Sequence, residues 1–195
     1  MWLAGAEYRF VLKPRALVEE LIAKPNATER QAWIDRNKSR IDAEFLDAFN
    51  ARAGEVADNG KSDGAMDLYR RSLAAARLIG NTRMAITAEY NIGLVTRERG
   101  DILGAMEIMR KCVANALDAG EKSLAANILN SLGQSLMREG SYALAIENLQ
   151  RAVTLAEEAG DRERIAQTSF TLGNVHIRLN QLAAFQAVYA RPAAD

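Results

Sequence analysis

Cysteine, histidine and proline are scarce in this chain: its 195 residues include one Cys, one His and three Pro. The single Cys112 excludes an intrachain disulfide and is typical of a reducing compartment, so we expect a cytoplasmic protein. With one His and one Cys, a zinc site would depend on carboxylates, and we expect no metal and no cofactor. The few prolines, together with many Ala, Leu, Glu and Arg residues, favour helix and give no reason to expect a sheet.

The chain also has no excess of positive or negative charge and no long apolar run. The 25 basic and 25 acidic residues give a formal net charge of zero, whereas nucleic-acid binders usually present a net basic face. No apolar run approaches the roughly 20 residues that a membrane-spanning helix needs. Glu7 and Arg9 interrupt the stretch in which a signal peptide would carry its apolar core. We therefore expect neither a nucleic acid nor a membrane as partner.

Glycines recur at a step of 40 residues: Gly93, Gly133 and Gly173 lie in the similar strings YNIGLV, NSLGQS and FTLGNV. The same step relates Gly60, Gly100 and Gly140, then Gly80, Gly120 and Gly160, and also Ala65, Ala105 and Ala145. A fixed period of about 20 to 50 residues indicates stacked units, none of which buries its apolar face alone. The repeat predicts one elongated domain whose function lies on a surface and not in a buried catalytic pocket.

Each repeat is predicted to be a pair of antiparallel helices. In residues 82–119, apolar residues three or four apart indicate a first helix that ends at Gly100. Asp101 offers an N-cap to a second helix, which ends at Gly120. Gly140 as helix stop and Ser141 as N-cap repeat this arrangement in the next unit.

The glycines within the first helices need a physical reason, because glycine in a helix interior costs about 1 kcal/mol relative to alanine. Close helix packing supplies that reason. We expect the second helix of each hairpin to approach the bare backbone at Gly93, Gly133 and Gly173, with the small Ala105 and Ala145 on the opposing side.

The strings YNIGLVTRERGDILGAMEIMRKCVANALDAG and NSLGQSLMREGSYALAIENLQRAVTLAEEAGD resemble tetratricopeptide (TPR) repeats. The shared features are the Leu-Gly pair (Ile-Gly in the first string), the turn glycine seven residues later, and the alanine five residues after that. The resemblance implies an all-α fold, a right-handed superhelical solenoid of antiparallel helix hairpins. The 40-residue step exceeds the commonest TPR length of about 34 and is similar to the repeats of cell-polarity adaptors and many bacterial signalling proteins.

The predicted organisation has five parts. These are an irregular N-terminal segment with two short capping helices (1–41), a degenerate hairpin (42–80), two full hairpins (81–120 and 121–160) and an incomplete fourth hairpin (161–195). Arg52 and Ala53 replace the Leu-Gly pair in the degenerate hairpin. In the fourth, Asn180 replaces the turn glycine and the bulky Phe185 replaces the small alanine, so we expect a distorted or frayed final helix.

The two ends of the chain differ in how well the repeats are covered. The segments PRALVEELIAK and TERQAWIDRNK offer Leu17, Leu21, Ile22, Trp33 and Ile34 for burial and are typical of a solenoid cap. No comparable cap is visible at the C-terminal end, where we expect a partner, a self-contact or a continuation of the chain. Two such helices before 40-residue repeats also resemble bacterial proteins in which a TPR region precedes a CHAT protease domain or another effector.

No catalytic constellation is visible in the sequence. His176 is equivalent to Leu136 in the repeat, so we expect it to have a packing role. Cys112 is equivalent to Ala152, which predicts a small core residue with no group to activate its thiol. We therefore expect a protein that is not an enzyme.

In TPR proteins the first helix of each hairpin lines a concave groove, and the resemblance therefore implies a set of groove residues. The aligned positions hold Thr87, Tyr90, Asn91, Leu94, Arg97, Asn127, Asn130, Gln134, Met137, Arg138, Gln167, Phe170, Asn174, Ile177 and Arg178. Amides can hydrogen-bond a peptide backbone, aromatic and methionine side chains can hold apolar groups, and arginines can bind carboxylates. The leading hypothesis is a non-catalytic protein-protein interaction module, a scaffold that binds a peptide or helix of a partner.

Two alternatives stay open. The chain could be a sensor or regulatory segment of a larger bacterial signalling protein or enzyme, or a scaffold that forms a homo-oligomer through its exposed last helix. One TPR subtype is argued against. Domains that clamp the C-terminal tails of chaperones use lysines, asparagines and an arginine at inner positions, and only Asn91 matches these here. We expect no binding of such tails.

Overall fold

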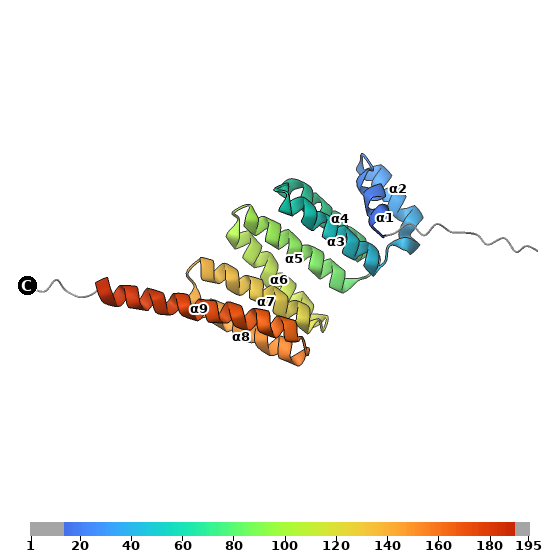
Figure 1. Cartoon of the computed structure of the whole chain (residues 1–195). Helices are drawn as coiled ribbons and strands as arrows, with labels where there is room; N and C mark the ends of the chain where they lie inside the picture. Colours follow the sequence, from blue (N-terminus) through green and yellow to red (C-terminus); the bar gives the residue numbers. More distant parts are fainter. Residues whose placement is uncertain (1–13, 190–195) are drawn as a thin grey trace, which may run out of the picture. The chain divides into compact units, whose positions relative to one another are not determined.

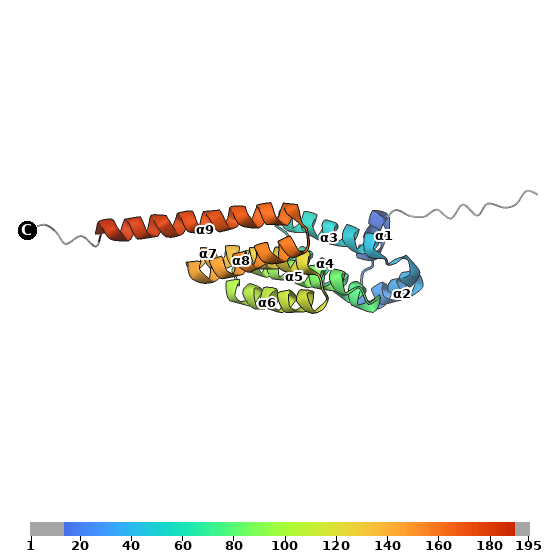
Figure 2. The same ribbon diagram turned by 90° about the horizontal axis from the view of Figure 1, so that it is seen from below.

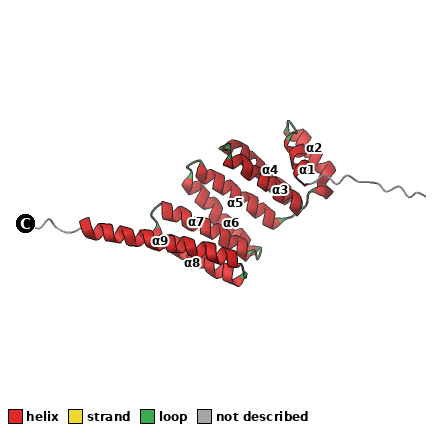
Figure 3. Ribbon diagram, in the orientation of Figure 1, coloured by secondary structure: helices red, strands yellow, loops and turns green. Residues whose placement is uncertain are grey.

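The computed structural model describes residues 14–189, with side chains for residues 14–183. Over these residues the chain forms nine α-helices, one short 3-10 helix and no strand. Figures 1 and 3 show the arrangement of the α-helices. The all-α prediction is therefore confirmed. The expectations for residues 1–13 and for the Phe185 side chain lie outside the described residues. The chain divides into two compact units, which meet at residues 85 and 86 within one helix.

The first unit contains the two N-terminal helices and the degenerate hairpin. Its elements are α1 (Pro14–Ile22), α2 (Ala27–Asn37), a 3-10 turn (Lys38–Arg40), α3 (Ala43–Asp58) and α4 (Ser62–Leu78). The predicted Leu17, Leu21 and Trp33 are buried, whereas Ile22 and Ile34 are half-buried. The rings of Trp33 and Phe45 stack with centroids 6.1 Å apart. These apolar contacts form the core of the unit.

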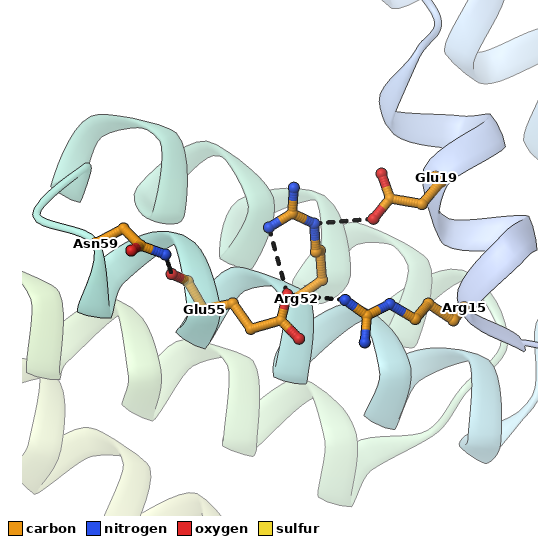
Figure 4. A network of polar contacts seen from close by, with 5 residues as sticks. All are labelled: Arg15, Glu19, Arg52, Glu55 and Asn59. Carbon is orange, nitrogen blue, oxygen red and sulfur yellow. Dashed lines mark hydrogen bonds and ion pairs between the residues drawn. The ribbon is translucent and has the colours of Figure 1, made fainter.

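A polar network joins α1 to α3 at the edge of this core (Figure 4). Arg52 on α3 binds Glu19 on α1 (Nε to Oε1, 2.8 Å), and Arg15 on α1 binds Glu55 on α3 (Nη2 to Oε2, 3.1 Å). Arg52 also lies 3.5 Å from Glu55, measured from Nη1 to Oε2. The full repeats carry an aliphatic residue at the position of Arg52. In this degenerate hairpin the arginine instead binds α1.

The second unit consists of the full hairpins and a long last helix. Its elements are α5 (Thr82–Glu98), which begins in the first unit, α6 (Ile102–Asp118), α7 (Lys122–Arg138), α8 (Tyr142–Glu158) and α9 (Arg162–Tyr189). The first helix of each hairpin ends on a left-handed glycine, with φ of 91° at Gly100 and 76° at Gly140. This backbone region favours glycine, so the chain reverses at the predicted residues. Asp101 follows as an N-cap whose side chain accepts a hydrogen bond from the Gly104 amide, as predicted, whereas Ser141 holds the N-cap position without a side-chain capping bond.

The glycines within the helices pack closely in two of the three repeats. A Cβ added at Gly133 would lie 2.6 Å from Cγ of Leu149, and one at Gly93 would lie 3.1 Å from Cγ2 of Ile108. Close packing is thus confirmed at these two sites, although the nearest atoms at Gly133 belong to Leu149 and not to Ala145. At Gly173 the expectation is wrong, because an added Cβ would meet nothing within 4 Å.

The fourth hairpin differs from the prediction. α9 continues through Asn180 to Tyr189 as a single helix, which extends beyond α7 and α8 in Figures 1 and 2. The other hairpins turn at a left-handed glycine, whereas Asn180 stands at this position and stays helical. Within residues 14–189 no second helix folds back onto Gly173.

The face of α9 that would receive a second helix is polar. Ser169 and His176 occupy the positions that Leu129 and Leu136 hold in α7. Both leucines are buried, whereas Ser169, Gly173 and His176 are exposed. The predicted packing role of His176 is therefore wrong, since no helix covers this side of α9. The polar replacements let this face contact water without exposing leucine side chains.

Candidate functional site

Two adjoining depressions lie between α7 and α9, on the side predicted to be the groove. They have volumes of about 320 and 410 Å³ and share Met137 and Asn174. The first is lined by Gln134, Met137, Arg138, Gln167, Phe170, Thr171 and Asn174, and the second by Met137, Asn174, Ile177, Arg178 and Gln181. Because the two depressions share residues, they form one continuous surface feature, which we call the α7–α9 groove.

The 40-residue repeat places chemically similar side chains on both walls of the α7–α9 groove. Gln134 on α7 is equivalent to Asn174 on α9, and Arg138 is equivalent to Arg178. Met137 is likewise equivalent to the aliphatic Ile177. Neighbouring repeats stack in register, so equivalent residues form rows across the repeats. The groove has one row each of amides, apolar side chains and arginines.

Large apolar side chains are exposed along the groove. Phe170 keeps 74% of its surface exposed and Ile177 keeps 56%. Met137 between them is half-buried. Isolated exposed hydrophobic residues are common on proteins, but a cluster within a depression is typical of a binding surface.

The groove carries positive charge, and no carboxylate is among its lining residues. Arg138 and Arg178 are exposed, and neither Asp nor Glu is among the residues that line the two depressions. A third arginine, Arg164, lies near the start of α9. Its Nη1 donates to Oδ1 of Asn127 at 2.8 Å and also to Oε1 of Gln167. This arginine therefore orients two of the predicted groove amides.

Two predicted groove residues are buried, and one of them joins two repeats. Tyr90 on α5 is 7% exposed, and its hydroxyl lies 2.6 Å from Oγ of Ser131 on α7. Burial, the largest cause, raises the pKa of the Tyr90 phenol. Asn130 is 2% exposed. Stacking of successive repeats covers both side chains, so neither is available on the surface of this structure.

The structure brings together only part of the predicted set. The α7–α9 groove contains Gln134, Met137, Arg138, Gln167, Phe170, Asn174, Ile177 and Arg178. Its linings do not include Thr87, Asn91, Leu94, Arg97 or Asn127, and Arg97 instead places Nη1 3.5 Å from Oγ of Ser135. Sequence reasoning missed Thr171 and Gln181. Their signal was the helical spacing, four residues after Gln167 and seven after Asn174.

The described residues show no arrangement typical of a metal site. Across residues 14–183, no group of three or more His, Cys, Asp or Glu side chains could hold an ion. Cys112 is fully buried, as predicted, and burial together with nearby Glu89 raises the pKa of its thiol to about 12. A thiol with this pKa is a poor nucleophile near neutral pH. No helix among the described residues has the length and apolar character needed to span a membrane.

A further depression lies on a different face of the second unit, between α6 and α8. Its lining includes Val113, Leu117 and Asn148 together with the charged Arg110, Asp118 and Arg151. The α7–α9 groove therefore differs from it in having no acidic residue.

Fold and groove together define a protein built of repeated antiparallel helix hairpins. Residues 124–186 match the tetratricopeptide repeat family, in agreement with the resemblance that the sequence shows. No sequence relative among curated proteins matches the chain.

Solved structures with the same fold have low sequence identity to this chain. BtubC from P. vanneervenii is 14% identical with a TM-score of 0.58, over 93% of this chain and 85% of that one. Aspartyl phosphate phosphatase F from Bacillus subtilis is 13% identical with a TM-score of 0.61, over 90% and 49%. A Rap protein complexed with Competence and Sporulation Factor is 18% identical with a TM-score of 0.57, over 87% and 56%. The chain thus spans about half the length of the last two proteins.

Proposed function

We propose that this chain is a non-catalytic protein-interaction module that binds a segment of a partner protein in the α7–α9 groove. The observation that carries the proposal is the groove itself, in which the exposed Phe170 lies among amides and arginines. Aromatic anchors beside hydrogen-bonding groups are the usual composition of peptide-binding surfaces. The similarity to a Rap protein whose structure contains a bound factor is consistent with this proposal.

A peptide selection with a matched control tests this proposal. Peptides of 12 residues are selected from a displayed random library on the wild-type protein, and their affinities are measured for Phe170→Ala and Leu103→Ala. Leu103 is 77% exposed on α6 and lines neither depression of the groove, so it controls for loss of an exposed apolar side chain. Truncating an anchor residue costs about 2 kcal/mol or more, so Phe170→Ala is expected to weaken binding at least about 30-fold.

Two results of this experiment would contradict the proposal. If the selected peptides bind Phe170→Ala as tightly as wild type, the groove is not the binding surface. If Leu103→Ala weakens binding as much as Phe170→Ala, the effect is not specific to the groove. Circular dichroism of both variants checks that the helices are retained.

Self-association is a second candidate function, supported by a different surface. Leu144 at the start of α8 and Leu179 on α9 line a mostly apolar depression, and Leu182 is exposed one turn further along. An exposed apolar patch of this kind can join two copies of a chain. Light scattering tests it: a mass that rises with concentration in wild type but not in Leu179→Gln supports the candidate, and a constant monomer mass contradicts it.

No observation on the described residues supports the alternative that the chain is a regulatory segment of a larger signalling protein. It stays a prediction, as does the cytoplasmic location.

A further inference from the structure

We propose that the α7–α9 groove binds an extended acidic segment that carries one large apolar side chain. This inference rests on the proposed function and specifies its ligand. The sequence left open whether the bound partner segment is an extended peptide or a helix. The inference chooses the extended peptide and assigns it a negative charge.

The charge follows from the two arginines. Arg138 and Arg178 occupy equivalent positions on neighbouring helices, both are exposed, and no acidic residue lines either depression. A guanidinium can bind a carboxylate through two parallel hydrogen bonds, which gives geometric specificity as well as affinity. A ligand with two suitably placed carboxylates can therefore pair one with Arg138 and the other with Arg178. A basic ligand would be repelled by both arginines. Because the whole chain has a formal net charge of zero, this preference comes from local placement and not from overall charge.

The extended conformation follows from the amides. Gln134 and Asn174 face the groove from α7 and α9, with Gln167 and Gln181 at its two ends. Each primary amide both donates and accepts hydrogen bonds. The backbone of an extended segment has free N–H and C=O groups that can pair with these amides. An α-helix has satisfied its backbone groups internally, so this row of amides would add little to its binding.

The apolar side chain follows from the surface between the two polar rows. Phe170 and Ile177 are largely exposed, and Met137 lies in both depressions. A large apolar side chain bound at Met137, which both depressions share, would adjoin the depression of Phe170 and that of Ile177. Because burial of apolar surface is favourable, such a side chain would be the anchor of the segment.

The selected peptides provide the test, with charge reversal and proline as the two probes. The peptides are sequenced, and their affinities are measured for wild type, for Arg138→Glu with Arg178→Glu, and for Arg110→Glu with Arg151→Glu on the other face as the matched control. We expect acidic sequences with a central large apolar residue. We expect the groove double variant to bind them at least about tenfold more weakly and with a smaller salt dependence, and the control to bind as wild type. A proline placed beside the anchor, which an α-helix does not tolerate, is expected to change affinity by less than about threefold.

The outcomes separate this inference from the function on which it rests. Peptides that need Phe170 but are neutral or basic, or that bind the groove double variant as well as wild type, overturn the acidic assignment and leave the binding module intact. A loss of binding of about tenfold or more on adding proline overturns the extended conformation. If no selected peptide depends on Phe170, both the proposed function and this inference fail.

Discussion

At the residue scale, three glycines at equivalent positions differ in what surrounds them. An added Cβ would lie 2.6 Å from Leu149 at Gly133, 3.1 Å from Ile108 at Gly93, and beyond 4 Å from any atom at Gly173. Leu149 is itself fully buried, so it has little room to move. Substituting alanine at each of the three sites therefore separates the effect of helix propensity on stability from the effect of packing.

We predict that Gly133→Ala is less stable than Gly173→Ala by about 1 to 3 kcal/mol, the usual cost of overpacking a core. Gly173→Ala alone is expected to raise the free energy of unfolding by up to about 1 kcal/mol, because alanine is the better helix former. Gly93→Ala should fall between them. Urea unfolding followed by circular dichroism measures all three. Equal values for Gly133→Ala and Gly173→Ala would contradict the packing at Leu149.

Cys112 gives a pH-dependent prediction. Burial raises the pKa of its thiol from 9 to about 12 in the folded protein, so folding favours the protonated form. This contribution to stability is fully present below about pH 9 and is lost as the pH rises towards 12. Between these values the free energy of unfolding of wild type should fall more steeply with pH than that of Cys112→Ala. Identical slopes for the two proteins would contradict this prediction.

At the element scale, α6 and α8 begin with different caps at equivalent positions. Oδ1 of Asp101 accepts a hydrogen bond from the Gly104 amide at 2.9 Å, whereas the Ser141 side chain makes no capping bond. Removing a helix cap costs about 1 kcal/mol. We predict that Asp101→Ala lowers the free energy of unfolding by about this amount and that Ser141→Ala changes it by less than about 0.5 kcal/mol. A larger loss for Ser141→Ala would show that the hydroxyl caps α8 in solution.

α9 is predicted to have unequal stability along its length. Residues Thr168, Thr171 and Val175 are buried, but every side chain from His176 to Ala183 is exposed. A helical stretch without packing is only marginally stable in water. Amide hydrogen exchange over 176–183 should therefore be faster than over 165–175. Equal protection at low concentration would contradict this, and protection that grows with concentration would support self-association.

The sequence specified the hairpins well because their signals are local. Glycine at the turn and a capping residue after it determine where each helix begins and ends, so α6 and α8 start beside the predicted Asp101 and Ser141. The path of α9 was harder to predict. Whether the chain turns at Asn180 depends on whether a second helix can cover α9, and the replacement of two leucines by Ser169 and His176 was the relevant signal.

At the scale of the whole molecule, the candidate site was only partly predictable. The repeat places Met137, Arg138 and Phe170 on one surface, since equivalent residues of stacked helices face the same way. Burial of Tyr90 and Asn130 was not visible in the sequence, because it depends on how closely neighbouring repeats approach. A residue at an inner position can thus join two repeats or contact a ligand, and only packing distinguishes these roles.

The most direct measurement of the central claim is an NMR titration of the isotope-labelled protein with a selected peptide. We predict chemical-shift changes at Met137, Phe170 and Asn174, and new contacts between the side-chain amide of Asn174 and the peptide backbone. Val113 and Leu117, which line the depression between α6 and α8, should not change. Shift changes at Val113 and Leu117 with none at Phe170 and Asn174 would contradict the claim that the α7–α9 groove is the binding surface.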